Sequence, residues 1–225
     1  MTSNPTQFPE KTFFITGPAG KIECLAGHPT NTDERRKAVG IICHPHPLFG
    51  GTMHNKVVHM IEKAYREMGL YTVRFNFRGV GESEGEFDNG IGESEDLICL
   101  YNWIKELFPE HDIWLAGFSF GSYAALQACP EIKPNQFLTI APPVERYDYT
   151  KFNAPKCPWL VIQGEVDDVV TPKAVYDYVN NLNPSPQLIT FKTGHFFHRR
   201  LIDLKGAIIN GTLRQLPEQE NEKPD

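Results

Sequence analysis

The decisive stretch of this sequence is residues 112–128, which read DIWLAGFSFGSYAALQA. Its apolar first part, 112–116, predicts a buried strand, and its last part, from about residue 121, predicts a helix. The pattern Gly117-Phe118-Ser119-Phe120-Gly121 lies in the turn between them, where the glycines let strand and helix approach closely and the serine takes a strained backbone conformation. A helix that begins there points its free N–H groups at the serine. Ser119 is therefore a candidate nucleophile, although the same pattern also arises by chance in strand-to-helix loops.

Strand-like and helix-like segments alternate on both sides of this turn. Short β-branched or aromatic runs predict strands, and segments with apolar residues three or four positions apart predict helices. This alternation favours an α/β fold with a mostly parallel sheet and helices on both faces, and a hairpin over residues 12–25 adds an antiparallel edge. The predicted strands cover residues 12–15, 21–25, 38–43, 71–77, 112–116, 137–140, 159–162 and 187–191, and the predicted helices cover 55–68, 94–107, 121–128, 172–182 and 198–213.

Length and composition predict a single globular domain. The chain of 225 residues is long enough for one sizeable core and short for two, and its 40% hydrophobic residues are ordinary for a globular protein. The polar ends, residues 1–10 and 218–225, are expected to be disordered tails.

Charge and hydropathy exclude two classes of partner. The net charge is −6 and no basic run interrupts the sequence, so nucleic acid is not an expected partner. No segment approaches the ~20 apolar residues of a membrane span, and the N-terminus lacks the pattern of a signal peptide, so no membrane partner is expected. The five cysteines form no CxxC pair, which fits a reducing cytoplasm. These features predict a cytoplasmic protein and leave monomer and homodimer both open.

A serine nucleophile demands a base and an acid elsewhere in the chain. A serine hydroxyl attacks only when a histidine takes its proton, and a carboxylate must orient that histidine. Glu165, Asp167 and Asp168 follow the predicted strand 159–162, at the edge where open α/β sheets build their sites. His195 follows the last predicted strand. The order serine, acid, histidine is the one that accompanies this turn pattern in α/β-hydrolases.

With these residues the chain resembles the α/β-hydrolase superfamily, in particular small lidless dienelactone-hydrolase-like bacterial hydrolases. The resemblance covers residues 12–216 and also rests on the His-Pro-x-x-x-x-Gly-Gly segment 44–51 and the Arg-Gly-x-Gly-x-Ser loop 78–83. It implies that the acid is Asp167, with Asp168 as the fallback, and that the base is His195. His198 is expected to pack or cap.

The resemblance also implies how the site holds its substrate. The Phe120 N–H is the first expected oxyanion donor, and the second is the N–H of His46 or, as the alternative, of Leu48, because Pro45 and Pro47 have no N–H. The interval 144–157 holds only fourteen residues, too few for a helical lid. We therefore expect an open site for small acyl groups, edged by the apolar side chains of Phe49, Phe118, Phe196, Leu48 and Tyr147.

The expected function is that of a serine hydrolase that cleaves a small carboxylic ester or thioester through an acyl-enzyme, without a cofactor. A catalytically idle binding protein of the same fold, or an acyltransferase or peptidase with the same triad, are the alternatives. A metal site is a further alternative, because His44, His46 and His54 could join His195 and His198. No His-Glu-x-x-His helix accompanies them, so no metal is expected. The loop 78–85 lacks the spacing of nucleotide-binding glycine loops.

Overall fold

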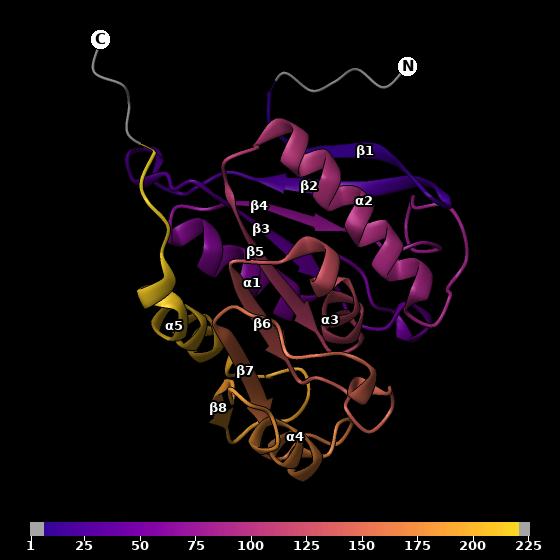
Figure 1. Cartoon of the computed structure of the whole chain (residues 1–225), viewed down its shortest axis with the longest axis vertical. Helices are drawn as coiled ribbons and strands as arrows, with labels where there is room; N and C mark the ends of the chain where they lie inside the picture. Colours follow the sequence, from indigo (N-terminus) through magenta and orange to yellow (C-terminus); the bar gives the residue numbers. More distant parts are fainter. Residues whose placement is uncertain (1–6, 221–225) are drawn as a thin grey trace.

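The computed structural model describes residues 7–220, which build one eight-stranded sheet (Figure 1). Across the sheet the strands follow the order β1-β2-β4-β3-β5-β6-β7-β8. The pairs β1–β2 and β2–β4 are antiparallel, and all other neighbours are parallel, as the sequence predicts. The strand bounds are Thr12–Gly17 (β1), Gly20–Gly27 (β2), Ala38–Cys43 (β3), Tyr71–Phe75 (β4), Asp112–Phe118 (β5), Gln136–Ile140 (β6), Trp159–Gly164 (β7) and Gln187–Phe191 (β8).

Helices cover both faces of the sheet. α1 packs against α5 on one face, and α2 packs against α3 on the other (Figure 1). Successive strand residues point to opposite faces, so Ile41 belongs to one apolar core and Ile42 to the other. The helix bounds are Lys56–Glu67 (α1), Ile91–Leu107 (α2), Phe120–Ile132 (α3), Pro172–Asn180 (α4) and Leu201–Thr212 (α5). Within residues 7–220, none of the helices combines the length and the apolar character that crossing a membrane requires.

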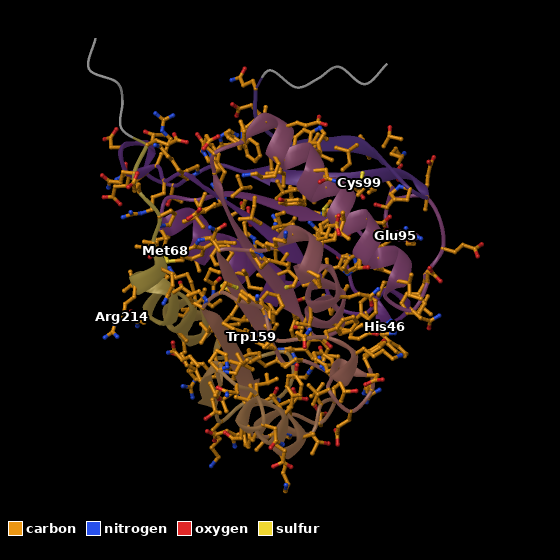
Figure 2. All side chains as sticks on the ribbon, in the orientation of Figure 1. His46, Met68, Glu95, Cys99, Trp159 and Arg214 are labelled. Atoms are coloured by element: carbon orange, nitrogen blue, oxygen red, sulfur yellow. The ribbon has the colours of Figure 1, made fainter. Side chains whose placement is uncertain are left out.

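The carboxyl ends of the parallel strands β3 and β5 to β8 all lie on the same side of the sheet. His46, in the loop after β3, lies on this side of the molecule, whereas Met68, at the end of α1, lies on the opposite side (Figure 2). Ligands of open α/β sheets bind outside the carboxyl ends of the strands. The loops after β3, β5, β7 and β8 are therefore the place to look for a site.

Two helix starts differ from the sequence prediction. The last helix begins at Leu201 rather than near His198, because Phe197 and Arg199 have positive φ angles of 51° and 62°, which interrupt a right-handed helix. The helix predicted from Ser94 begins at Ile91 instead. Glu93 accepts hydrogen bonds from the N–H groups of Asp88 and Gly90 and so stabilises the earlier start.

The prediction of disordered tails over 1–10 and 218–225 is wrong for the parts that the structure describes. Phe8 is buried against the rings of Tyr71 and Phe108. Residues 218–220 run beside residues 35–37, where the Lys37 N–H donates to Glu218 O (2.9 Å) and the Glu220 N–H donates to Arg35 O (2.8 Å). The polar side chains of residues 218–220 gave no sign of this pairing, because its hydrogen bonds join backbone groups. Residues 1–6 and 221–225 lie outside the described residues.

Candidate active site

Ser119 occupies the turn between β5 and α3 with φ 52° and ψ −123°, a strained conformation for a residue with a side chain. The turn leaves no space for side chains at its flanking glycines. A Cβ at Gly117 would lie 2.3 Å from Gly121 O, and a Cβ at Gly121 would lie 2.5 Å from Cys43 O. The two glycines are thus required for α3 to begin directly above β3 and β5.

His195 and Asp167 extend from Ser119 in a single hydrogen-bonded row. The Nε2 atom of His195 lies 3.1 Å from Ser119 Oγ, and its Nδ1 atom lies 2.8 Å from Asp167 Oδ2. Asp167 comes from the loop after β7 and His195 from the loop after β8, and all three residues are buried. The structure therefore brings together Ser119, His195 and the acid that the family resemblance implies, Asp167.

Four hydrogen bonds hold the Asp167 carboxylate. Its Oδ1 accepts the backbone N–H groups of Val169 and Val170, each at 2.8 Å, and its Oδ2 accepts from His195 and from Gln163 Nε2 at 3.1 Å. Burial opposes the charged form, but the bonds from His195, Val170 and Val169 outweigh it and lower the pKa of Asp167. The group therefore stays an acceptor at neutral pH.

The two neighbouring acids stay outside this network. Asp168 and Glu165 are exposed, and Glu165 accepts a hydrogen bond from Thr190 Oγ1. Of the three acids in the loop, Asp167 is the one that meets the histidine.

Sequence reasoning missed Gln163. Its side chain is fully buried, and its amide nitrogen donates both to Asp167 Oδ2 and to Gly164 O. Its Oε1 has no partner among the described residues, which costs stability. The available signal was a single polar residue at the carboxyl end of the otherwise apolar run Trp159–Ile162.

The two expected oxyanion donors remain free. Among residues 7–220, neither the Phe120 N–H nor the His46 N–H donates a hydrogen bond within the protein. The Leu48 N–H, the alternative, instead donates to His46 Nδ1 at 3.2 Å, so it is not available. This bond forms because His46 caps the short helical turn Pro47–Phe49.

A cavity of about 330 Å³ opens beside Ser119 and His195. Phe49, Phe196 and Tyr147 line it, as the sequence predicts, and Phe49 is 81% exposed. Phe118 does not line it. This prediction is wrong because Phe118, the last residue of β5, points into the core. There the centroid of its ring lies 5.0 Å from the centroid of the His195 ring, and the two rings pack together. Leu48 is exposed outside the cavity.

Several further residues line the cavity that the sequence did not single out as site residues, although Pro45, Gly50 and Gly51 belong to the His-Pro-x-x-x-x-Gly-Gly segment. They are Pro45, Gly50, Gly51, Asn55, Pro143, Arg146, Val169 and Val170. A larger cavity of about 760 Å³ lies at the opposite, amino ends of the strands, around Trp159 and Gln187, the first residues of β7 and β8. It holds none of the predicted site residues, so volume alone does not locate the site.

The histidines do not gather around a metal. Within residues 7–220, no group of three or more His, Cys, Asp or Glu side chains is arranged to hold an ion. His44 is fully buried and uses both ring nitrogens inside the protein, since Nδ1 lies 2.6 Å from Pro45 O and Nε2 accepts the Phe77 N–H at 3.0 Å. His198 precedes α5 and contacts the ring of Phe196, so it packs rather than caps.

The chain is similar to known serine hydrolases. Residues 112–200 match the protein family described as Serine hydrolase (FSH1). A lidless α/β serine hydrolase from Xanthomonas campestris is 43% identical, with a TM-score of 0.90 and coverage of 94% of this chain and 98% of that chain. An α/β serine hydrolase homologue from Coxiella burnetii is 42% identical, with a TM-score of 0.86 and coverage of 91% and 98%.

A curated relative without a known function extends the same comparison. An uncharacterised protein of Rickettsia prowazekii is 36% identical over 208 residues, which are 87% of this chain and 85% of the relative. The identities above 40% extend over almost the full length of both solved structures, the fold agrees with both, and the missing lid agrees with the Xanthomonas campestris protein. The chain therefore belongs to the α/β serine hydrolases without a lid.

Proposed function

We propose that this protein hydrolyses small carboxylic esters or thioesters through an acyl-enzyme on Ser119, with His195 as general base and Asp167 as the acid that orients it. One observation carries the proposal. Ser119 Oγ lies 3.1 Å from His195 Nε2, and His195 Nδ1 lies 2.8 Å from Asp167 Oδ2, so the three side chains form one continuous row. Ser119 and His195, at one end of this row, line a cavity.

The first half of the reaction follows from these contacts. Because Asp167 accepts the Nδ1 proton of His195, the Nε2 atom carries the lone pair that takes the Ser119 proton. The Ser119 oxygen then bonds to the carbonyl carbon of the ester. The carbonyl oxygen gains a negative charge that the N–H groups of Phe120 and His46 are available to stabilise.

The second half returns the protein to its starting state. The His195 imidazolium gives its proton to the leaving alcohol or thiol as the carbon–oxygen or carbon–sulfur bond breaks. Water then attacks the acyl group on Ser119, and His195 takes the proton from that water and passes it to Ser119 as the acid leaves.

A panel of 4-nitrophenyl esters and one short acyl thioester tests the proposal. The wild-type protein should hydrolyse the acetate and butyrate esters, and Ser119→Ala should lose this activity while its circular dichroism stays unchanged. Ser185→Ala, a serine outside the cavity, is the control and should keep it. Turnover that survives in Ser119→Ala would overturn the mechanism, and a folded wild-type protein without turnover would favour an idle binding protein.

A further inference from the structure

Arg146 gives the cavity beside Ser119 a positive charge. Among the described residues that line the cavity, it is the only one with a permanent charge, and none of them carries a carboxylate. The rest of the lining consists of aromatic, aliphatic, glycine, asparagine and histidine residues and Ser119. An anion that enters the cavity therefore meets a cation and no opposing acid.

The Arg146 guanidinium is held at the cavity wall. Its Nη2 donates to Val169 O at 3.0 Å, and Val169 belongs to the same loop as Asp167 and lines the same cavity. His46, in the loop after β3, lines the same cavity, and burial and then the Arg146 charge lower the pKa of His46. The guanidinium thus contacts the loop after β7 and lines a cavity that the loop after β3 also lines.

Arg146 is not neutralised by the protein. Across residues 7–220, no carboxylate lies within ion-pairing distance of it, and the backbone oxygen of Val169 takes one of its five N–H donors. Its neighbour Glu145 accepts the Thr171 N–H instead, and Glu93 is occupied by the N–H groups of Asp88 and Gly90. The remaining N–H donors have the fork geometry that matches a carboxylate.

A second donor faces the same space. Asn55 lines the cavity, and its Oδ1 accepts the Val57 N–H at 2.8 Å to cap α1. Its amide nitrogen has no partner within the part of the chain that the structure describes. Arg146 and Asn55 thus both present hydrogen-bond donors to the cavity, which suits an anionic acceptor.

We propose that Arg146 makes this site selective for small esters that carry a carboxylate a few bonds away from the scissile carbonyl. This inference rests on the proposed ester hydrolysis and adds the substrate class to it. Arg146 would act as a specificity-determining residue that binds the free carboxylate while Ser119 attacks the ester.

Two pairs of esters that differ only in charge test the inference. The first pair is mono-4-nitrophenyl adipate and 4-nitrophenyl adipamate, with the carboxylate or its neutral amide on the acyl side. The second pair is 4-acetoxybenzoate and 4-acetoxybenzamide, with the same contrast on the leaving group. In at least one pair, we expect the wild-type kcat/KM to be higher for the anion by about tenfold, the order expected of a charge-assisted hydrogen bond.

Arg146→Gln should remove this preference, measured as the ratio of kcat/KM for the anion to kcat/KM for its neutral partner, and Arg146→Lys should restore part of it. The matched control is Lys151→Gln, which removes a positive charge from the same segment but outside the cavity. It should keep the preference. Raising the salt concentration should weaken the preference in the wild type, because ions screen an exposed charge.

Each other result overturns the inference. Equal rates within both pairs, or a preference that persists in Arg146→Gln, would show that Arg146 does not read the substrate charge. An equal loss on both members of a pair in Arg146→Gln would mean that Arg146 only tethers its segment to Val169. A wild type that hydrolyses none of the four esters would overturn the proposed function itself, which distinguishes the two failures.

Discussion

Asp167 and Asp168 are adjacent in the sequence and have opposite surroundings. Asp167 is buried and accepts four hydrogen bonds, whereas Asp168 is exposed and makes none with the described residues. The sequence alone did not separate them, because both follow the same strand at the same edge. The resemblance to a known family selected Asp167, and the contacts with Val169 and Val170 give the physical reason.

The pair offers a matched test of the proposed acid. Asp167→Asn places an amide where Gln163 and His195 both donate, so one donor loses its acceptor and the histidine takes the wrong tautomer. We expect kcat/KM for 4-nitrophenyl butyrate to fall by about 10⁴-fold, as in other serine triads. Asp168→Asn should change it little. If Asp168→Asn is the impaired variant, the acid is assigned to the wrong position.

Arg146 and Gln163 mark the limit of what single residues reveal in the sequence. Neither the exposed arginine nor the buried glutamine belongs to a sequence motif. The role of each becomes visible only from the residues that it contacts in the fold. Ser119 and His195, in contrast, lie in short patterns at predicted strand ends, so their positions could be predicted.

At the scale of elements, the segment after β6 decides which substrates fit. Residues 144–157 form only the short helical turn Tyr149–Lys151, and Tyr147 stacks on Tyr123 of α3 at a centroid distance of 4.5 Å. This segment edges the cavity without covering it. The missing lid could be predicted because the length of the interval is visible in the sequence.

An open cavity of about 330 Å³ predicts a short acyl preference. Measured as kcat/KM over the 4-nitrophenyl acetate, butyrate, octanoate and dodecanoate esters, activity should fall steeply beyond the butyrate. The reason is that a longer chain gains no further buried surface once it leaves the cavity. Higher activity on the dodecanoate than on the butyrate would contradict the expectation.

Element boundaries were less predictable than the elements themselves. The strands appear where apolar runs place them, but the start of α5 depends on the left-handed conformations of Phe197 and Arg199. These conformations keep the loop that carries His195 compact, through bonds such as Phe197 N–H to Gly194 O. Helical periodicity in the sequence contains no information about such turns.

At the scale of the whole molecule, the buried imidazole of His44, at the start of the loop after β3, contributes to the stability of the fold. It lies at the end of β3, and burial lowers its pKa to about 4, although its bond to Pro45 O partly opposes this shift. Its Nε2 accepts the Phe77 N–H, which requires the neutral ring. Protonation would therefore break a contact between β3 and the segment after β4.

The sign of the pH effect follows from this shift. The folded pKa of His44 is below the value of about 6.5 for an unfolded chain, so the unfolded state binds more protons between these pH values. The stabilisation is complete above pH 6.5 and is lost as the pH falls towards 4. We expect the free energy of unfolding to decrease by about 3 kcal/mol over this range through His44 alone.

Urea unfolding at several pH values checks this expectation. His44→Gln should lower stability near pH 7 and remove this part of the pH dependence. His54→Gln replaces an exposed histidine and should leave the dependence as it is. A wild type whose stability is the same at pH 4.5 and pH 7 would rule out a neutral, buried His44.

The arrangement of the whole sheet was only partly predictable. Alternating periodicities predicted parallel strands with an antiparallel edge, and both are confirmed. The position of β3 between β4 and β5 is not encoded in any local pattern, because it depends on which buried strands pair across α1 and α2. That placement is what lets the loop after β3 reach Ser119.

Covalent labelling tests the central claim, that Ser119 is the nucleophile of a hydrolase, most directly. The protein is incubated with a fluorophosphonate, and the modified residue is located by mass spectrometry of the intact chain and of its peptides. We predict one label per chain on Ser119, loss of ester hydrolysis in step with labelling, and no label on Ser119→Ala. A label on a different residue, or full hydrolytic activity in a protein that stays unlabelled, would contradict the account.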